Sequence, residues 1–92
     1  MKYEIYTTHQ FDKAFKLCQR RKFPMEKLHS VIKILAKNGC LPEQYHPHKL
    51  KDFRNHNTWE CHIEADWLLV WEQNDRQLTL LMLDTGTHAD LF

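Results

Sequence analysis

The stretch of residues 59–71 constrains the fold most strongly, because two different strand patterns follow each other within it. Residues 59–64 alternate between apolar and polar side chains, which predicts a strand with one buried face and with His62 on the other. Residues 67–71 are apolar throughout, which is typical of a strand buried on both faces. Asp66 lies at the turn between them. We therefore expect a rigid sheet that holds an imidazole close to a carboxylate, a suitable place for acid–base chemistry.

The N-terminal half predicts a first strand and two helices. Residues 2–7 alternate and indicate the strand, and Thr7 or Thr8 can cap the helix that follows. The apolar stripe of this helix consists of Phe11, Ala14, Phe15 and Cys18. Pro24 begins a second helix and Gly39 ends it, because glycine readily adopts the left-handed cap. We expect the two helices to form an antiparallel hairpin.

The C-terminal half continues the sheet after a polar loop and a charged turn region. Residues 74–75 lie between the strand patterns Trp67–Gln73 and Gln77–Leu83 and predict a hairpin turn. Residues 84–92 predict a glycine-centred turn with a short tail. Residues 1–92 therefore form one domain of the α+β class. Its predicted order is a strand, a two-helix hairpin and a mainly antiparallel twisted sheet of three to four strands, with both helices on one face.

Charge is distributed unevenly along the chain, although the net charge is only +1. Residues 1–54 hold twelve of the thirteen Lys and Arg against five acids, a balance of +7, and residues 55–92 have a balance of −6. A basic half fits either a polyanionic partner or an ordinary solvated helix face. Three scattered cysteines without a CxxC pair indicate reduced thiols in a cytoplasmic protein. The sequence contains no signal peptide or apolar run long enough to span a membrane.

Seven histidines are a high number for 92 residues, and they allow two interpretations. The first is a metal site in which His46 and His48 combine with His62 or Asp66, although no spacing matches a structural zinc motif. The second is general acid–base catalysis. Metal-free RNA cleavage needs a base for the 2′-hydroxyl, an acid for the leaving 5′-oxygen and a cation near the phosphate, and histidine can fill the first two roles. We favour a site without metal or cofactor.

Two aromatic residues are candidates for contact with an RNA base. Stacking of a base on an aromatic ring contributes roughly 1–3 kcal/mol. Phe92 follows a polar tail, which favours this role, whereas Trp67 opens an apolar strand, which favours the core.

Three stretches resemble motifs of a known family. Residues 60–69 (ECHIEADWLL) and residues 85–92 (TGTHADLF) resemble the two signature stretches of YafQ-like toxins, which belong to the RelE superfamily of bacterial type II toxin–antitoxin systems. Residues 48–50 (HKL) resemble the family's His-Pro-Leu motif. The resemblance covers the whole chain. It implies a RelE-like fold and an endoribonuclease, or mRNA interferase, that cuts mRNA in the ribosomal A site and is neutralised by a cognate antitoxin.

The resemblance also implies a catalytic set, which maps to His48, His62, Asp66 and His88. His88 is the expected general acid. His48, Asp66 or both are expected to position or deprotonate the 2′-hydroxyl, and His62 to support the site or contact the phosphate. Phe92 is the expected supporting aromatic, with Trp67 as a second candidate for substrate binding.

Two positions depart from the family pattern. Asp84 and Trp59 stand where many relatives carry arginine, so the expected phosphate-binding cation is missing at both. We therefore expect Lys49, Lys51 and Arg54 to contact the substrate instead. Two alternatives are that the RNA of the ribosome supplies the environment for cleavage and that the enzyme is slow. Asp84 either repels the phosphate or supports a neighbouring histidine or backbone turn.

The implied partners are a cognate antitoxin, the ribosome with its mRNA, and operator DNA through the antitoxin complex alone. An acidic antitoxin tail is expected to cover the basic half of the chain. Two alternatives remain. One is a catalytically weak or inactive member that acts as an antitoxin-binding regulatory module. The other is a ParE-like inhibitor of a protein target such as a topoisomerase, although the histidine-rich tail argues against it.

Overall fold

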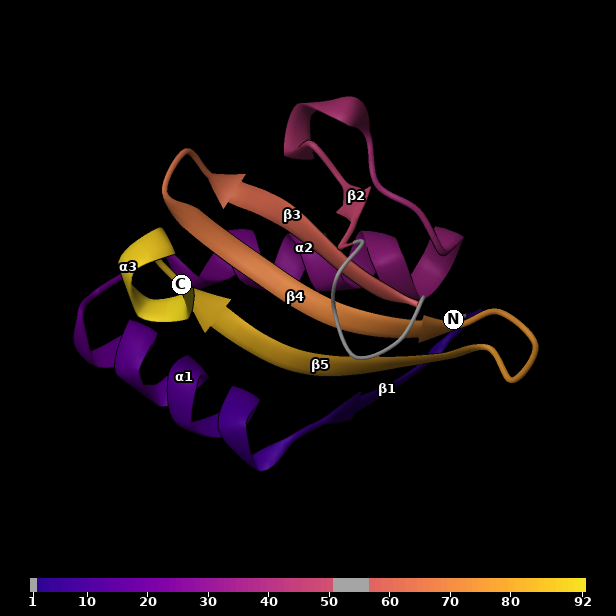
Figure 1. The fold of residues 1–92 in the computed structure, drawn as a ribbon, viewed down its shortest axis with the longest axis horizontal. Helices are drawn as coiled ribbons and strands as arrows, with labels where there is room; N and C mark the ends of the chain where they lie inside the picture. Colours follow the sequence, from indigo (N-terminus) through magenta and orange to yellow (C-terminus); the bar gives the residue numbers. More distant parts are fainter. Residues whose placement is uncertain (1, 51–56) are drawn as a thin grey trace.

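The computed structural model describes residues 2–50 and 57–92. Across these residues, five strands form one sheet in the order β1-β5-β4-β3-β2 (Figure 1). The strands are β1 (Glu4–Thr7), β2 (His48–Lys49), β3 (Thr58–Glu64), β4 (Trp67–Asn74) and β5 (Thr79–Gly86). β1 pairs with β5 in parallel, and the pairs β5–β4, β4–β3 and β3–β2 are antiparallel. The central position of β4 agrees with its nearly continuous apolar sequence.

The helices follow from their caps. They are α1 (His9–Arg20), α2 (Met25–Asn38), the 3₁₀ turn η1 (Glu43–Tyr45) and the short α3 (His88–Leu91). The Thr8 hydroxyl caps α1 by accepting the N–H of Phe11 at 3.0 Å. α2 ends at Gly39, which adopts a left-handed conformation with φ of +71°. None of the helices in the described part of the chain is long and apolar enough to cross a membrane.

α1 and α2 pack on the same face of the sheet, which we call the first face, and the hydrophobic core lies between them and the strands. Figure 1 shows α2 crossing behind β3 and β4. Large, fully buried side chains of this core include Leu28, Leu35, Trp67, Leu69, Trp71 and Leu80. Because side chains alternate along a strand, Glu60 and His62 project from the opposite, second face of β3. α3 packs against β5 and η1 against β3.

Two irregularities in the sheet affect the second face. The β3–β4 register shifts between His62 and Glu64, next to the turn that carries Asp66. The β4–β5 register shifts between the pairs Val70–Asp84 and Trp71–Met82, which leaves Leu83 as an extra residue in β5. A bulge of this kind bends a strand and redirects its side chains.

The predicted α+β order is confirmed, including the helix hairpin on one face and the Thr8 cap. Four strands follow the helices, in agreement with the predicted three to four, and β1 adds a fifth. The tail differs from its prediction, because β5 continues to Gly86 and the tail then forms α3. The reason is a capping box, in which the Thr87 hydroxyl accepts the N–H of Asp90 while the Asp90 carboxylate accepts the N–H of Thr87.

Candidate active site

Asp66 and His88 form the best-defined contact on the second face. The Oδ1 atom of Asp66, in the turn between β3 and β4, lies 2.7 Å from Nδ1 of His88 and accepts the His88 backbone N–H at 3.0 Å. These bonds, the backbone bond first, lower the pKa of the Asp66 carboxyl below its usual value. With Nδ1–H donating to a carboxylate, Nε2 of His88 remains available to exchange a proton with a ligand.

His62 lies beside His88 in a row of three imidazoles. The ring centroids of His62 and His88 are 5.6 Å apart, and those of His62 and His46 are 5.9 Å apart. Nδ1 of His62 lies 3.3 Å from the carbonyl oxygen of Ala65, so it carries the proton in the tautomer that makes this bond. Nε2 of His62 then has a free lone pair. His46 ends η1 in a left-handed conformation, with φ of +49°.

His48 forms a second contact with a carboxylate. His48 pairs with Glu60 across the β2–β3 ladder, and its Nε2 lies 3.2 Å from Oε1 of Glu60. Its Nδ1 lies 3.0 Å from the carbonyl oxygen of His46. Both ring nitrogens thus face acceptors, an arrangement in which a protonated ring donates two hydrogen bonds. Glu60 is 6% exposed, and its Oε2 has no hydrogen-bond partner among the described residues.

Of the basic residues expected to contact the substrate, the described residue Lys49 points away from this cluster. Lys49 pairs with Trp59, and its Nζ lies 5.7 Å from the centroid of the Trp59 ring. Trp59 stacks on Trp71 at the first face, with ring centroids 6.2 Å apart. Because neighbouring residues of a strand point to opposite faces, Lys49 lies on the other side of the sheet from His48. The remaining two candidates, Lys51 and Arg54, lie outside the described residues.

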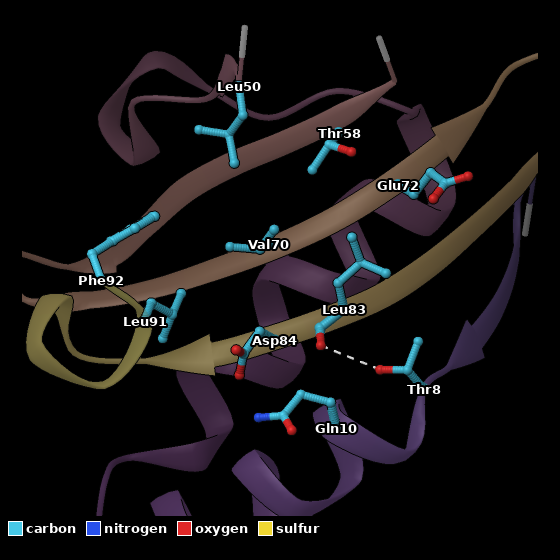
Figure 2. A pocket seen from close by; sticks show the side chains of 10 residues that line it. All are labelled: Thr8, Gln10, Leu50, Thr58, Val70, Glu72, Leu83, Asp84, Leu91 and Phe92. Atoms are coloured by element: carbon cyan, nitrogen blue, oxygen red, sulfur yellow. Dashed lines mark hydrogen bonds between the residues drawn. The ribbon is translucent and has the colours of Figure 1, made fainter. Parts of the chain in front are cut away.

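The two aromatic candidates take different positions. Trp67 is 2% exposed, contacts Phe23 edge-to-face at 5.1 Å and donates its indole N–H to the hydroxyl of Thr85 at 2.9 Å. Trp67 therefore belongs to the core, and its ring is not available to stack on an RNA base. We do not include Trp67 among the proposed substrate contacts. Phe92 is 71% exposed and lines a pocket on the second face (Figure 2).

Asp84 lines the same pocket. Its Oδ1 accepts the backbone N–H of Thr85 at 2.8 Å. Burial raises the pKa of the Asp84 carboxyl, and hydrogen bonds from Thr85 and Gln10 oppose this effect. Of the roles considered for Asp84, support of the backbone therefore fits the geometry, whereas the carboxylate that contacts His88 is Asp66.

Several contributing residues escaped the sequence analysis. Glu60 is one of the polar residues in the alternating pattern of residues 59–64, and its pairing with His48 depends on the β2–β3 register. Arg21, after the end of α1, binds Asp90 of α3 at 2.7 Å and so ties the helix hairpin to the element that begins with His88. The Thr-x-x-Asp spacing of residues 87–90 is the signal that could have predicted α3. Within the described residues, no group of three His, Cys, Asp or Glu side chains is placed to hold a metal ion.

Comparison with known proteins decides the family. Residues 3–92 match the family described as bacterial toxin of type II toxin-antitoxin system, YafQ. The chain belongs to the YafQ family. Two curated YafQ relatives from Escherichia coli, each named mRNA interferase toxin YafQ, are 35% identical in strain B / BL21-DE3 and 34% identical in strain K12. Both alignments are 94 positions long and cover 97% of this chain and 95% of the relative.

Solved toxin structures share the fold of this chain. The E. coli DinJ-YafQ complex contains a chain that superposes with a TM-score of 0.89 at 35% identity, covering 98% of both chains. A metal-bound toxin from Helicobacter pylori superposes with a TM-score of 0.88 at 33% identity, covering 100% of both chains. The RelE-like arrangement expected from the sequence is therefore confirmed.

Proposed function

We propose that this YafQ-family toxin is a ribosome-dependent endoribonuclease that cleaves mRNA by histidine acid–base catalysis. The observation that carries the proposal is the pair His62 and His88, whose ring centroids lie 5.6 Å apart. Each ring has its Nδ1 against a protein oxygen, which leaves both Nε2 atoms for the substrate. The E. coli relatives are named mRNA interferases, which supports the same activity.

The two imidazoles divide the proton transfers between them. His62 takes the proton of the 2′-hydroxyl on Nε2, because its Nδ1–H is directed at a neutral carbonyl oxygen. The 2′-oxygen then forms a bond to phosphorus, and the bond from phosphorus to the 5′-oxygen breaks. His88 donates the proton that this leaving oxygen needs, since the Asp66 carboxylate compensates the charge of the protonated ring. Asp66 acts as a positioning residue in this scheme rather than as the base.

The charge on the phosphate is balanced by further imidazoles in place of the missing arginines. His46 is exposed beside His62 and, when protonated, adds a positive charge next to the reacting group. His48 holds a second positive charge when both its nitrogens donate, although Glu60 offsets it. Lys51 and Arg54 remain our candidates for contacts with the RNA backbone.

Removal of each proposed proton-transfer group tests the mechanism. His88→Ala and His62→Ala should each slow cleavage on the ribosome by roughly 10²–10⁴-fold, the usual contribution of a general acid or base. His9→Ala is the matched control, because His9 is an exposed histidine at the start of α1. Folding should persist in all three variants. Unchanged transcript cutting by a folded His88→Ala protein would remove His88 from the mechanism.

A chelator separates this metal-free mechanism from one that depends on a bound metal ion. The metal-dependent alternative needs a test because the similar toxin from H. pylori is metal-bound. EDTA should leave the cleavage rate unchanged, because the proposed proton transfers need no metal. Loss of activity in EDTA that added zinc or copper restores would establish a metal-dependent reaction instead.

We propose a cognate antitoxin as the physiological partner, by analogy with the E. coli DinJ-YafQ complex. The balance of +7 over residues 1–54 suits an acidic antitoxin segment. The same basic surface should meet ribosomal RNA, so the two ligands exclude each other, and operator DNA is reached through the antitoxin complex. The activity then takes place in the cytoplasm, where ribosomes are. Undiminished cleavage by a ribosome-bound toxin that also holds its antitoxin would contradict this arrangement.

A catalytically weak regulatory member is the second candidate, favoured by Asp84 and Trp59 at positions where the family resemblance leads us to expect arginine. Induction of the chain in bacteria, followed by mapping of transcript ends, separates the candidates. Codon-phased cuts support the nuclease. Intact transcripts with normal growth support the regulatory module, and intact transcripts with arrested replication support a ParE-like inhibitor.

A further inference from the structure

A pocket of about 390 Å³ opens on the second face of the sheet, and the proton transfers above make no use of it. Figure 2 shows Val70 of β4 in the middle, with Leu50 on one side, Leu83 and Asp84 on the other, and Phe92 at one end. Small-ligand sites commonly enclose roughly 300–1,000 Å³, so the space is sufficient for a planar heterocycle.

The bulge in β5 shapes this pocket. In a regular strand, neighbouring residues point to opposite faces, so Leu83 and Asp84 would not line the same space. The register shift between the pairs Val70–Asp84 and Trp71–Met82 lets both side chains reach the pocket. Leu83 contributes apolar surface to the pocket, and Asp84 contributes a carboxylate. The Thr8 hydroxyl anchors this part of β5 from α1, by donating to the carbonyl oxygens of Met82 and Leu83 at 3.0 and 3.2 Å.

The polar groups of the pocket are mainly acceptors. The described residues that line it include two carboxylates, Asp84 and Glu72, and no lysine, arginine or histidine. Gln10 contacts Asp84 from α1. Carboxylates repel a phosphate group but accept hydrogen bonds from N–H groups. The pocket therefore suits a flat, largely apolar ligand that donates hydrogen bonds at its edge.

The pocket is directly connected to the proposed catalytic residues. Phe92 donates its backbone N–H to the carbonyl oxygen of His88 at 2.9 Å, so the aromatic wall and the proposed acid belong to the same turn of helix. A second connection runs through the β3–β4 pairing, in which Val70 in the middle of the pocket pairs with Glu60, and Glu60 contacts His48. A nucleotide with its phosphate at the histidine row therefore has this pocket as the adjoining space for a base.

We propose that this pocket binds the base of a nucleotide next to the scissile phosphate and favours bases with an exocyclic amino group over uracil. The amino group donates to the carboxylate of Asp84, while the ring lies against Val70, Leu83 and Phe92. Uracil instead presents two carbonyl oxygens on either side of its N3–H, and the carboxylate repels them. The selection rests on the proposed nuclease function. It should amount to roughly tenfold or more, as for other side chain–base pairs.

Cleavage of matched reporter mRNAs tests the selection. The reporters differ by a single nucleotide at each position of the cut codon, with uracil compared against adenine, cytosine and guanine. At one position of the cut codon, the wild-type protein should cut reporters with adenine, cytosine or guanine roughly tenfold faster or more than the reporter with uracil. Asp84→Asn and Asp84→Leu should lower this ratio, and Asp12→Asn, which removes an exposed acid from α1, should keep it. An equal ratio in the wild type and Asp84→Leu would overturn the proposal.

A binding measurement judges the pocket separately from the nuclease activity. Adenosine and purine riboside differ by the amino group alone, and the Thr85 amide, which bonds to Asp84, reports on the pocket by NMR. Adenosine should shift this signal at lower concentration than purine riboside does. If the protein cuts no mRNA, the nuclease proposal fails, and an equal or absent response to both nucleosides overturns the pocket proposal as well. Weakened antitoxin binding by Asp84→Leu with unchanged base selection would assign the pocket to a basic antitoxin side chain, and would also overturn it.

Discussion

One oxygen atom of Asp66 holds both the backbone and the ring of His88, at 3.0 and 2.7 Å. The contact joins the β3–β4 turn to α3, two segments separated by 22 positions in the sequence. It therefore holds the first residue of α3 and leaves Nε2 as the ring nitrogen of His88 that is free to meet a ligand. The low pKa of Asp66 keeps the carboxylate ionised near neutrality.

Asp66→Asn tests this positioning role. The substitution keeps the size of the side chain but removes its charge, so cleavage should fall by roughly 10²-fold, within the range of acid–base contributions. Wild-type cleavage by a folded Asp66→Asn protein would contradict the positioning role.

Gly86→Ala should impair the site without unfolding the sheet. A Cβ at this position would lie 2.9 Å from Oδ2 of Asp90 and 3.1 Å from Cδ1 of Leu91, and the backbone φ of +154° disfavours other residues. α3 should shift, and His88 with it, so we expect cleavage to fall at least tenfold with a cooperative unfolding transition retained. Ala89→Ser, at an exposed position of α3, is the control. Wild-type cutting by Gly86→Ala would show that α3 tolerates the extra methyl group.

Thr8→Ala should destabilise the whole domain. The Thr8 hydroxyl caps α1 and also donates to carbonyl oxygens of β5, so its removal affects both elements. A lost N-cap lowers the free energy of unfolding by about 1–2 kcal/mol. The urea midpoint should therefore fall with an unchanged slope, and Thr8→Ser should recover most of the loss. A midpoint equal to that of the wild type would contradict the anchoring role of Thr8.

The three free cysteines should differ sharply in reactivity. Burial raises the pKa of the Cys61 thiol to about 12 and also raises that of Cys18, whereas Cys40 is exposed. At pH 8 a thiol reagent should label Cys40 quickly in the native protein and all three cysteines in denaturant. Because the raised pKa favours the folded state while the thiol is protonated, this contribution to stability is present below pH 9 and decreases towards pH 12. Rapid labelling of Cys61 in the native protein would contradict its burial.

Local signals predicted the helical part of the fold well. The Thr8 cap, the apolar stripes and the left-handed Gly39 act within a few residues, so the sequence contains their whole cause. The capping box that forms α3 is equally local. The glycine-centred turn predicted for residues 84–92 is wrong in this respect, because Gly86 ends β5 and the capping box then begins α3.

The geometry of the site depends on strand register, which short sequence patterns do not determine. The signature stretches indicated His62, Asp66 and His88, and the structure brings these three together. The direction of the Lys49 side chain follows from the pairing of β2 with β3, so short sequence patterns do not predict that it points away from the cluster. The same pairing creates the contact between His48 and Glu60.

The parallel pairing of β1 with β5 has a consequence for biosynthesis. Glu4 pairs with Thr79, so β1 has no partner strand until the residues around position 79 have been synthesised. Such distant pairing makes folding slow compared with that of helical domains. His88 follows β5 in the sequence, so the proposed acid is synthesised after the strand that pairs with β1. Nascent chains that end before residue 79 lack both this strand and His88, so they cannot carry the proposed site.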